Sequence, residues 1–489
     1  MRRRTLSVIG LGATALGAVL WWRRRATRST AQPAALPITG VGARRARLAA
    51  VGARAGADWA THRARRVFAS AERKEQLDTE FELRTAEQVA AALGEMKGAL
   101  MKLGQMASYL DQGLPEHVRD ALAQLQSDAP PMSAELAAGV IRRELGRHPE
   151  EIFATWDPVP IASASIGQVH RAMTRDGAAV AVKVQYPGVA EAMASDLANI
   201  GLLFGGLGQL FPGFEPGPVV AELRERLTEE LDYANEAANQ IRFAEEYAGH
   251  PFIHVPQVHS DLSTARVLTT DLADGVSFAE VAATWSQSER DLAAETLYRF
   301  AFGSLYQLRM FNGDPHPGNY LFRPGGQITF LDFGLVKHFT EAELMPFEEM
   351  IKAMVIEPDP AVFRSIIEDV GLLPAGEPFT NDEVVEYFSH FYELVRESGE
   401  MTITPEYASE SVRRFFDQRG PYGPIMRRVN LPASFVVIQR INLGLYALFG
   451  DLHARGDWRG LAEEIWPFVG APPSTPMGEA IATWERQRR

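Results

Sequence analysis

The chain of 489 residues contains no cysteine, so disulfide bonds and thiolate metal sites are excluded. It also lacks the positive charge that a protein needs to bind a nucleic-acid backbone over a large surface, because its formal net charge at pH 7 is −13. No nucleic-acid partner is therefore expected. Hydrophobic residues make up 46% of the chain, and its length is enough for a two-lobed domain with extensions.

A segment in the second half of the chain carries the chemistry of phosphoryl transfer. Residues 312–319 read N-G-D-P-H-P-G-N, so that Asn319 follows Asp314 by five positions, and D-F-G begins at Asp332, thirteen residues later. In enzymes that use Mg·ATP, one Asp orients the attacking hydroxyl or water, and an Asn and a second Asp hold the metal. Each pattern alone could be an acidic turn, but their order and spacing predict Asp314 as catalytic and Asn319 and Asp332 as metal ligands.

The phosphate-binding part of such a site is expected upstream. Val180-Ala181-Val182-Lys183 is typical of the strand whose Lys contacts the nucleotide phosphates. A segment of small residues lies just before it, where a glycine-rich loop would lie, although Ala and Ser replace most glycines and should stiffen the backbone. A plain hairpin turn is the alternative. The nucleotide contacts predicted here come from Lys183 and from Ala162, Ser163, Ala164, Ser165, Ile166, Gly167 and Val169.

Residues 266–271 are predicted to form a strand. Residues 270–273, at the end of that strand and just after it, lie where a hinge between two lobes would contact adenine. Asp271 and Ala273 are therefore added to the predicted nucleotide contacts. Downstream of the D-F-G the chain is expected to be mostly helical. One apolar helix face there is formed by Leu344, Phe347, Ile351 and Met354.

An amphipathic helix is predicted from Leu223 to Asn239, and it could supply the acid that holds Lys183. Most helical acids face solvent, so the pattern by itself does not choose among Glu229, Glu230, Asp232 and Glu236.

Four stretches together resemble the UbiB (aarF-domain) family of atypical kinase-like proteins. They are K-x-G-Q at 102–105, the Ala/Ser loop, E-L-D-Y-A-N-E-A at 230–237, and the loop from Asp314 to Asn319. The similarity extends from about residue 85 to about residue 345. It implies an α+β, atypical protein-kinase-like fold with two lobes, an N-terminal helical extension carrying K-x-G-Q, and a helical C-terminal region. It also implies ATP or ADP with Mg²⁺ as cofactors.

The resemblance assigns roles to further residues. It implies that Glu236 pairs with Lys183, and that Glu230 and Asp232 belong to the family's E-x-D element. Lys102 and Gln105 would belong to a lid over the active site. This chain departs from the family's alanine-rich loop by alternating Ala and Ser at 162–165, so a nucleotide preference set by those alanines does not transfer directly.

Members of the family are described as ATPases or unorthodox kinases linked to isoprenoid-quinone (coenzyme Q) metabolism at membranes. The expected function is a membrane-associated ATPase or phosphotransferase that supports ubiquinone-type lipid biosynthesis. Its partners would be a nucleotide, membrane lipids or isoprenoid quinone precursors, and quinone-biosynthesis proteins. Two alternatives stay open: a small-molecule or protein phosphotransferase unrelated to quinones, and a nucleotide-binding regulatory scaffold. The Gly before Asp314 favours small-molecule phosphotransferases over protein kinases.

The N-terminal residues have a different character. Three arginines precede an uncharged run from Thr5 to Trp22, and three more follow it, which predicts a membrane-spanning helix of minimal length. A cleaved signal peptide is the competing interpretation. Because ATP is cytosolic and further arginines follow the run, we expect a single span in the cytoplasmic membrane with the catalytic domain in the cytoplasm.

The predicted organisation has six parts. They are a membrane anchor (1–25), an Ala/Arg-rich helical linker (26–84), a K-x-G-Q helical extension (85–135), an N-lobe with an insertion (136–275), a mostly helical C-lobe (276–470) and a tail (471–489).

Overall fold

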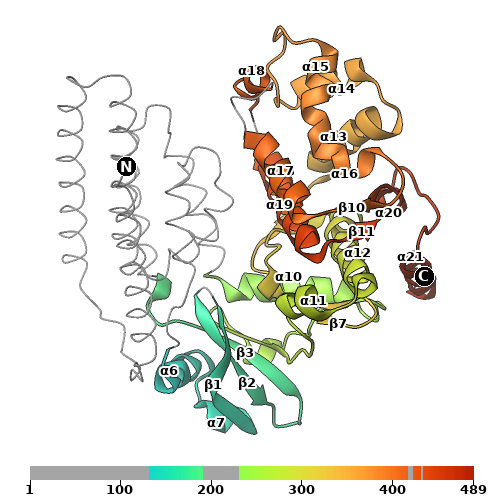
Figure 1. Ribbon diagram of the computed structural model, residues 1–489. Helices are drawn as coiled ribbons and strands as arrows, with labels where there is room; N and C mark the ends of the chain where they lie inside the picture. Colours follow the sequence, from blue (N-terminus) through green and yellow to red (C-terminus); the bar gives the residue numbers. More distant parts are fainter. Residues whose placement is uncertain (1–131, 165, 191–230, 417–421, 431–432, 489) are drawn as a thin grey trace, which may run out of the picture.

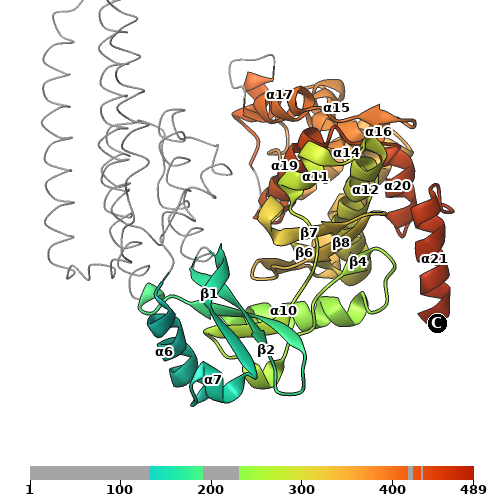
Figure 2. The same ribbon diagram turned by 60° about the horizontal axis from the view of Figure 1, so that its bottom comes forward.

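A computed structural model describes residues 132–164, 166–190, 231–416, 422–430 and 433–488 (Figure 1). These residues form a small lobe around a β-sheet and a larger, mostly helical lobe. Helix α10 (Tyr233–Glu246) lies at the boundary between them in both views (Figure 2). Several predicted features lie outside the described residues: the anchor and linker, most of the K-x-G-Q extension with Lys102 and Gln105, Glu230, and Ser165.

The N-lobe is built on an antiparallel sheet with the strand order β1-β2-β3-β5. Alternate side chains of β3, at Val180, Val182 and Val184, are fully buried, as expected for a strand with one face on a core. Ile141 of α6 is buried in the same cluster. The elements are α6 (Ala134–Leu145), α7 (Pro149–Ile152), β1 (Thr155–Ala164), β2 (Gly167–Met173), β3 (Ala179–Gln185) and β5 (Val267–Asp271).

The start of α10 differs from the helix predicted at Leu223. Leu231 lies in a turn, and Asp232 has non-helical dihedral angles, with φ −110° and ψ 88°. The Asp232 carboxylate accepts hydrogen bonds from the backbone N–H groups of Ala234 and Asn235, at 3.0 and 3.3 Å. Such a cap satisfies N–H groups that have no partner within the helix, which favours a helix start here over a continuous helix. The predicted helix was therefore wrong at 231–232.

Short strands of the C-lobe bring the two acidic segments together. Strands β6 and β9 pair in antiparallel fashion, and β4-β8-β7 form a second small sheet. The segment with Asp314 lies between β6 and β7, and the D-F-G lies between β8 and β9. The bounds are β4 (Ile253–His254), β6 (Met310–Asn312), β7 (Tyr320–Arg323), β8 (Gln327–Phe330) and β9 (Val336–His338), with 3-10 turns at Ser260–Leu262 and Pro317–Asn319.

Helices make up the rest of the C-lobe and enclose a large apolar core. Leu344, Phe347 and Ile351 are buried on one face of α13, as predicted, and Met354 is buried in the π-helical turn after it. The helices are α11 (Phe278–Thr284), α12 (Gln287–Gly303), α13 (Glu341–Ile351), α14 (Pro360–Asp369), α15 (Asn381–Ser389), α16 (Glu393–Arg396), α17 (Pro405–Phe416), α18 (Gly423–Met426), α19 (Ala433–Leu452), α20 (Trp458–Ile465) and α21 (Pro476–Arg488).

Smaller elements complete this lobe. Strands β10 and β11 pair in antiparallel fashion, π-helical turns follow α12 and α13, and a 3-10 turn follows α15. Their bounds are β10 (Met401–Thr402), β11 (Arg455–Gly456), η3 (Ser304–Leu308), η5 (Lys352–Ile356) and η6 (His390–Tyr392). Helix α21 occupies most of the segment predicted as a tail. Within the described ranges, no helix combines the length and apolar character required to cross a membrane, and the run from Thr5 to Trp22 lies outside them.

Candidate active site

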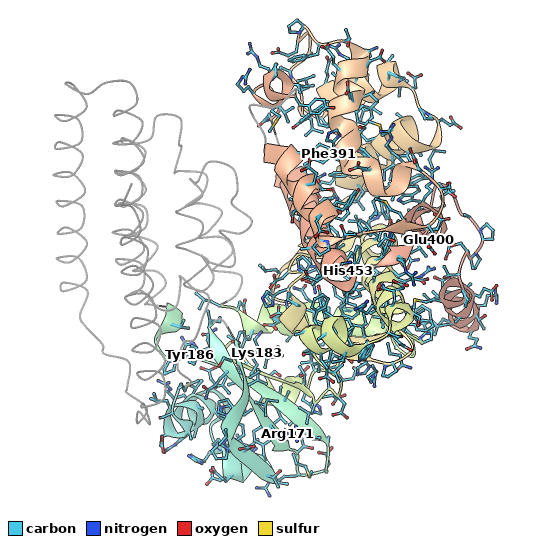
Figure 3. The ribbon with its side chains drawn as sticks, in the orientation of Figure 1. Arg171, Lys183, Tyr186, Phe391, Glu400 and His453 are labelled. Atoms are coloured by element: carbon cyan, nitrogen blue, oxygen red, sulfur yellow. The ribbon has the colours of Figure 1, made fainter. Side chains whose placement is uncertain are left out.

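The side chain of Lys183 joins two carboxylates where the lobes meet. Its Nζ donates to Oε1 and Oε2 of Glu236 at 2.7 and 2.9 Å, and to Oδ2 of Asp332 at 3.4 Å. The ring centroid of Tyr233 lies 4.9 Å from the same nitrogen, which adds a cation–π contact. Figure 3 labels Lys183 on the part of the N-lobe that faces the C-lobe. Strand β3, helix α10 and the D-F-G segment thus meet at one ammonium group.

The electrostatics of this cluster favour a permanently charged lysine. Burial opposes the charge, but the carboxylates of Asp332 and Glu236 outweigh it, so the pKa of Lys183 lies well above its usual value. The side chain of Glu236 is 4% exposed, whereas that of Asp332 is 31% exposed. Asp332 is therefore the carboxylate of the cluster that a metal ion reaches more easily.

Hydrogen bonds within the loop after β6 hold Asp314 in place. Nδ2 of Asn319 donates to the Asp314 carboxylate and to its main-chain carbonyl, both at 3.2 Å. Asn312 braces the two segments, because its Nδ2 donates to the Asp332 carbonyl at 2.7 Å and its Oδ1 accepts from the Asp314 N–H at 3.3 Å. His316 accepts a hydrogen bond from the Gly318 N–H at 3.1 Å, which gives it a role in shaping the loop.

Asn319 and Asp332 fit a magnesium ion shared with nucleotide phosphates. Mg²⁺ prefers oxygen ligands and in such sites takes one or two carboxylates together with phosphate and water. Because Nδ2 of Asn319 bonds to Asp314, its Oδ1 is the atom that remains for a metal. No cluster of three or more His, Asp or Glu side chains suited to a metal occurs among the described residues. Phosphate oxygens would therefore have to complete the coordination.

The predicted phosphate loop is the tip of the β1–β2 hairpin, where Ala164 pairs with Gly167. Ala162 and Ser163 are exposed, Ile166 is buried, and Ser165 lies outside the described residues. A Cβ atom on Gly167 would clash with the Val184 carbonyl and would lie 2.8 Å from the Tyr233 hydroxyl. This glycine is thus required for close packing against β3 and α10. Val169 is half-buried and pairs with Lys183 across the sheet.

The predicted hinge follows the end of β5. The N–H of Asp271 donates to the Gln257 carbonyl, and the N–H of Leu272 donates to the Ala179 carbonyl, both at 2.9 Å. The carboxylate of Asp271 lies 2.8 Å from Nε2 of His259. These contacts fix the direction of the chain as it leaves the N-lobe, and Ala273 follows directly.

Two residues of α10 have contacts that the sequence did not reveal. Asn239 donates from Nδ2 to the Phe333 carbonyl at 3.1 Å, and its Oδ1 lies 3.1 Å from Nε2 of His338. Tyr233 packs against both Lys183 and Gly167. Asn239 follows Glu236 by three positions and therefore lies on the same helix face, which was the available signal. Asp232, predicted as part of a regulatory element, caps this helix.

Comparison with known proteins places this chain in a family. The sequence profile of the ABC1 atypical kinase-like domain matches residues 124–365. The solved complex of Rv3197 with erythromycin, from Mycobacterium tuberculosis, is 32% identical, with a TM-score of 0.60. That alignment covers 82% of this chain and 100% of the Mycobacterium chain. The chain belongs to the ABC1 (aarF-domain, UbiB) family of atypical kinase-like proteins. The predicted family and the predicted α+β, kinase-like fold are confirmed.

Curated relatives match over a little more than half of the chain. Mouse AarF domain-containing protein kinase 1 is 34% identical over 276 residues, which are 54% of this chain and 52% of that protein. Rat mitochondrial atypical kinase COQ8B is 34% identical over 270 residues, 55% of this chain and 51% of that protein. The chain thus spans about half the length of these relatives.

Proposed function

We propose that this member of the family is an enzyme that binds Mg·ATP and hydrolyses or transfers its terminal phosphoryl group. The observation that carries the proposal is the Lys183 ammonium group, held by Glu236 and in contact with Asp332. The loop with Asp314 and Asn319 is braced against the same D-F-G segment through Asn312. A phosphoryl-transfer site needs these groups at one place, because its catalysis depends on positioning and on charge neutralisation.

Each residue has a defined task in this proposal. The magnesium ion, when bound through Asn319 and Asp332, would neutralise phosphate charge. Lys183 contacts the phosphates, and Glu236 keeps its ammonium group in position. Asp314 orients the attacking hydroxyl or water and takes up its proton. The hairpin tip at 162–169 covers the phosphates, while Asp271 and Ala273 adjoin the adenine.

A phosphate-release assay tests the activity directly. Asp314→Asn should lower phosphate release from ATP by about a hundredfold or more, since general-base groups contribute on that scale. Nucleotide binding should persist. Asp369→Asn changes an exposed carboxylate on α14 and serves as the control. Unaltered turnover in Asp314→Asn would remove the assignment of this residue and favour the scaffold alternative.

The biological setting we propose is isoprenoid-quinone lipid metabolism, supported by the match to the relative named COQ8B. The partners would be membrane lipids or quinone precursors and quinone-biosynthesis proteins. Lipid profiling of a deletion strain tests this proposal, with complementation by the parent chain and by Asp332→Asn. An unchanged quinone profile in the deletion strain would favour a phosphotransferase unrelated to quinones.

Two proposals concern residues outside the described ranges. Lys102 and Gln105 are proposed as a lid, so Lys102→Ala or Gln105→Ala should change the ratio of ATP hydrolysis to autophosphorylation while nucleotide binding persists. Kinetics equal to those of the parent would mean that both are ordinary surface residues.

Thr5–Trp22 is proposed as a single membrane span with the catalytic domain in the cytoplasm. Protease digestion of that domain in intact spheroplasts would contradict this orientation.

A further inference from the structure

Helix α21, the last described helix, connects the core of the C-lobe to the end of α10. Figure 2 shows α21 at one edge of the C-lobe. Its residues, Pro476–Arg488, lie beyond the stretch that the family profile matches, which ends at residue 365. Neither the family match nor the residues of the proposed nucleotide site give this helix a task.

The beginning of α21 is fixed to the C-lobe by a nearly buried ion-pair cluster. Arg299 of α12 pairs with Glu295 and with Glu464 of α20, both at 2.8 Å, and the side chains of Arg299 and Glu464 are each 7% exposed. Arg299 also donates to Oγ1 of Thr475, just before α21, at 3.0 Å. A Cβ atom on Gly478 would lie 2.9 Å from this guanidinium. The first turn of α21 therefore packs directly on the cluster.

The other half of α21 contacts the end of α10 and the turn after it. Nε1 of Trp484 donates to the Ala248 carbonyl at 3.2 Å, and its ring meets the His250 ring edge to face, with centroids 4.6 Å apart. The guanidinium of Arg488 donates to the carbonyls of residues 245–246, the last two of α10. It also lies 4.7 Å from the centroid of the Trp484 ring, so the two side chains support each other.

Helix α10 supplies little of its own to stabilise this end. Its last turn contains no basic residue, and neither Tyr247 nor Ala248 adopts the left-handed conformation that commonly ends a helix. The last carbonyls of a helix lack partners within the helix and carry partial negative charge. Arg488 brings both hydrogen-bond donors and a positive charge to them from another helix.

The same helix positions the candidate active site. Glu236 holds Lys183, and Asn239 donates to the Phe333 carbonyl of the D-F-G. Glu236 is only about 15 Å from the end of α10, so a shift of that end moves these side chains as well. Phe243 packs against Phe333 midway along the helix, but apolar packing has no preferred direction. Hydrogen bonds to main-chain carbonyls are directional and fix the end of the helix more tightly.

We propose that Trp484 and Arg488 are positioning residues, which hold the D-F-G and the Lys183 cluster in place through α10. This inference rests on the proposed function, because it assigns α21 a task in the same site. Without the contacts from α21, the end of α10 shifts and the hydrogen bond from Asn239 to the Phe333 carbonyl weakens.

Amide hydrogen exchange without nucleotide tests the inference independently of any enzyme activity. The double variant Trp484→Phe/Arg488→Met keeps the apolar part of both side chains and removes their hydrogen bonds to the three carbonyls. We expect about tenfold faster exchange in peptides that cover 236–243 and 332–338, and unchanged exchange in α14. Arg486→Met is the matched control and should exchange like the parent, because Arg486 is exposed and bonds to Thr483 within α21.

Two further variants separate positioning from a general loss of stability. In Asn239→Asp the donor to the Phe333 carbonyl is already absent, so the double variant should add nothing to the exchange at 332–338. Arg488→Lys in place of Arg488→Met keeps a cationic donor and should bring this exchange back toward that of the parent. The proposal is overturned if exchange at 332–338 stays at the parent's rate in the double variant, or rises equally in α14. It is also overturned if the effect persists in Asn239→Asp, or if Arg488→Lys restores nothing.

A milder variant decides the matter if the double variant fails to fold. Trp484→Phe alone removes the hydrogen bond to the Ala248 carbonyl and should speed exchange at 332–338 about threefold, while an unchanged rate would overturn the proposal. Phosphate release is measured on the same proteins, and kcat should fall about tenfold in the double variant. A parent that shows the expected exchange but releases no phosphate would contradict the proposed function and support the positioning by α21.

Discussion

Asn239 donates a hydrogen bond from its side-chain amide to the main-chain carbonyl of Phe333, across 3.1 Å. Glu236, one turn earlier on α10, holds Lys183. A single helix face thus positions both the lysine and the D-F-G segment. The ring of Phe333 is fully buried and lies 4.9 Å from that of Phe243, also on α10, which strengthens the connection.

The first prediction tests this connection through Asn239→Asp. The variant keeps an oxygen for His338 but loses the Nδ2 donor to the Phe333 carbonyl. The carboxylate oxygen that replaces this donor repels the carbonyl oxygen. We expect kcat for phosphate release to fall roughly tenfold, since the lost hydrogen bond and the unpaired carbonyl cost about 1–3 kcal/mol. Asn235→Asp, exposed on the same helix, is the control. Equal kcat values in both variants would mean that α10 does not position the D-F-G.

A second prediction concerns the stability of the Lys183 cluster. Lys183→Met leaves the nearly buried Glu236 carboxylate without its cation, so the free energy of unfolding should fall by about 3 kcal/mol. Glu236→Gln, added to this variant, removes the carboxylate charge that lost its lysine and should restore a large part of that loss. Urea unfolding of the parent, both single variants and the double variant measures the coupling. Additive losses would show that the pair is not coupled.

A third prediction follows from the contact between α19 and the loop that carries Asp314. A Cβ atom on Gly444 would overlap with Cγ of Pro315, so Gly444→Ala must displace the helix or the loop. We expect kcat to fall roughly ten- to a hundredfold, because small displacements of a catalytic group are costly. Gly139→Ala is the matched control, since no atom lies within 4 Å of the added methyl and a helical alanine should stabilise α6 by about 0.5–1 kcal/mol. A Gly444→Ala enzyme with the parent's kcat would show that the loop tolerates the shift.

The fourth prediction is a pH dependence of stability from His250. Burial, with smaller effects of Arg299 and Arg488, lowers the pKa of His250 from 6.5 to about 3 in the folded protein. Its Nδ1 accepts hydrogen bonds from the N–H groups of Phe252 and Ile253, at 3.1 and 2.8 Å, and protonation would remove this acceptor. The unfolded chain takes up the proton near pH 6.5, so the stabilisation is present above that pH and is lost as the pH falls toward 3.

His250→Asn separates the two effects, because an amide oxygen can accept these hydrogen bonds but does not titrate. Between pH 7.5 and pH 5 the parent should lose about 2 kcal/mol more unfolding free energy than the variant does. Urea unfolding at several pH values gives the difference, and any contribution of the other histidines cancels in it. Parallel pH profiles for the parent and the variant would contradict this account.

The residues that we propose for phosphoryl transfer could be picked out in the sequence because their order and spacing define the pattern. Asp314, Asn319 and Asp332 occur in the order that phosphoryl transfer requires, and the β6–β9 pair brings their segments together. The partner of Lys183 was not readable from the helical pattern, since several acids lay nearby in the sequence. Only the resemblance to the family pointed to Glu236.

Other features depend on contacts between distant residues. Asn239 reaches a carbonyl 94 positions away, and the glycine at 167 is required by the Val184 carbonyl on the neighbouring strand. Local pattern also failed at Asp232, where the cap overrides a continuous helical periodicity.

The most direct test of the account is the magnesium dependence of nucleotide binding. In the parent, ATP or ADP with Mg²⁺ should raise the melting temperature more than the same nucleotide with a chelator does. A ligand at 100 times its Kd stabilises the folded protein by about 2.7 kcal/mol. Asp332→Asn should abolish this magnesium-dependent part, and Asp369→Asn, on the exposed side of α14, should keep it. The account predicts a shift that disappears in Asp332→Asn alone. A magnesium-dependent shift of the same size in Asp332→Asn as in the parent would contradict it.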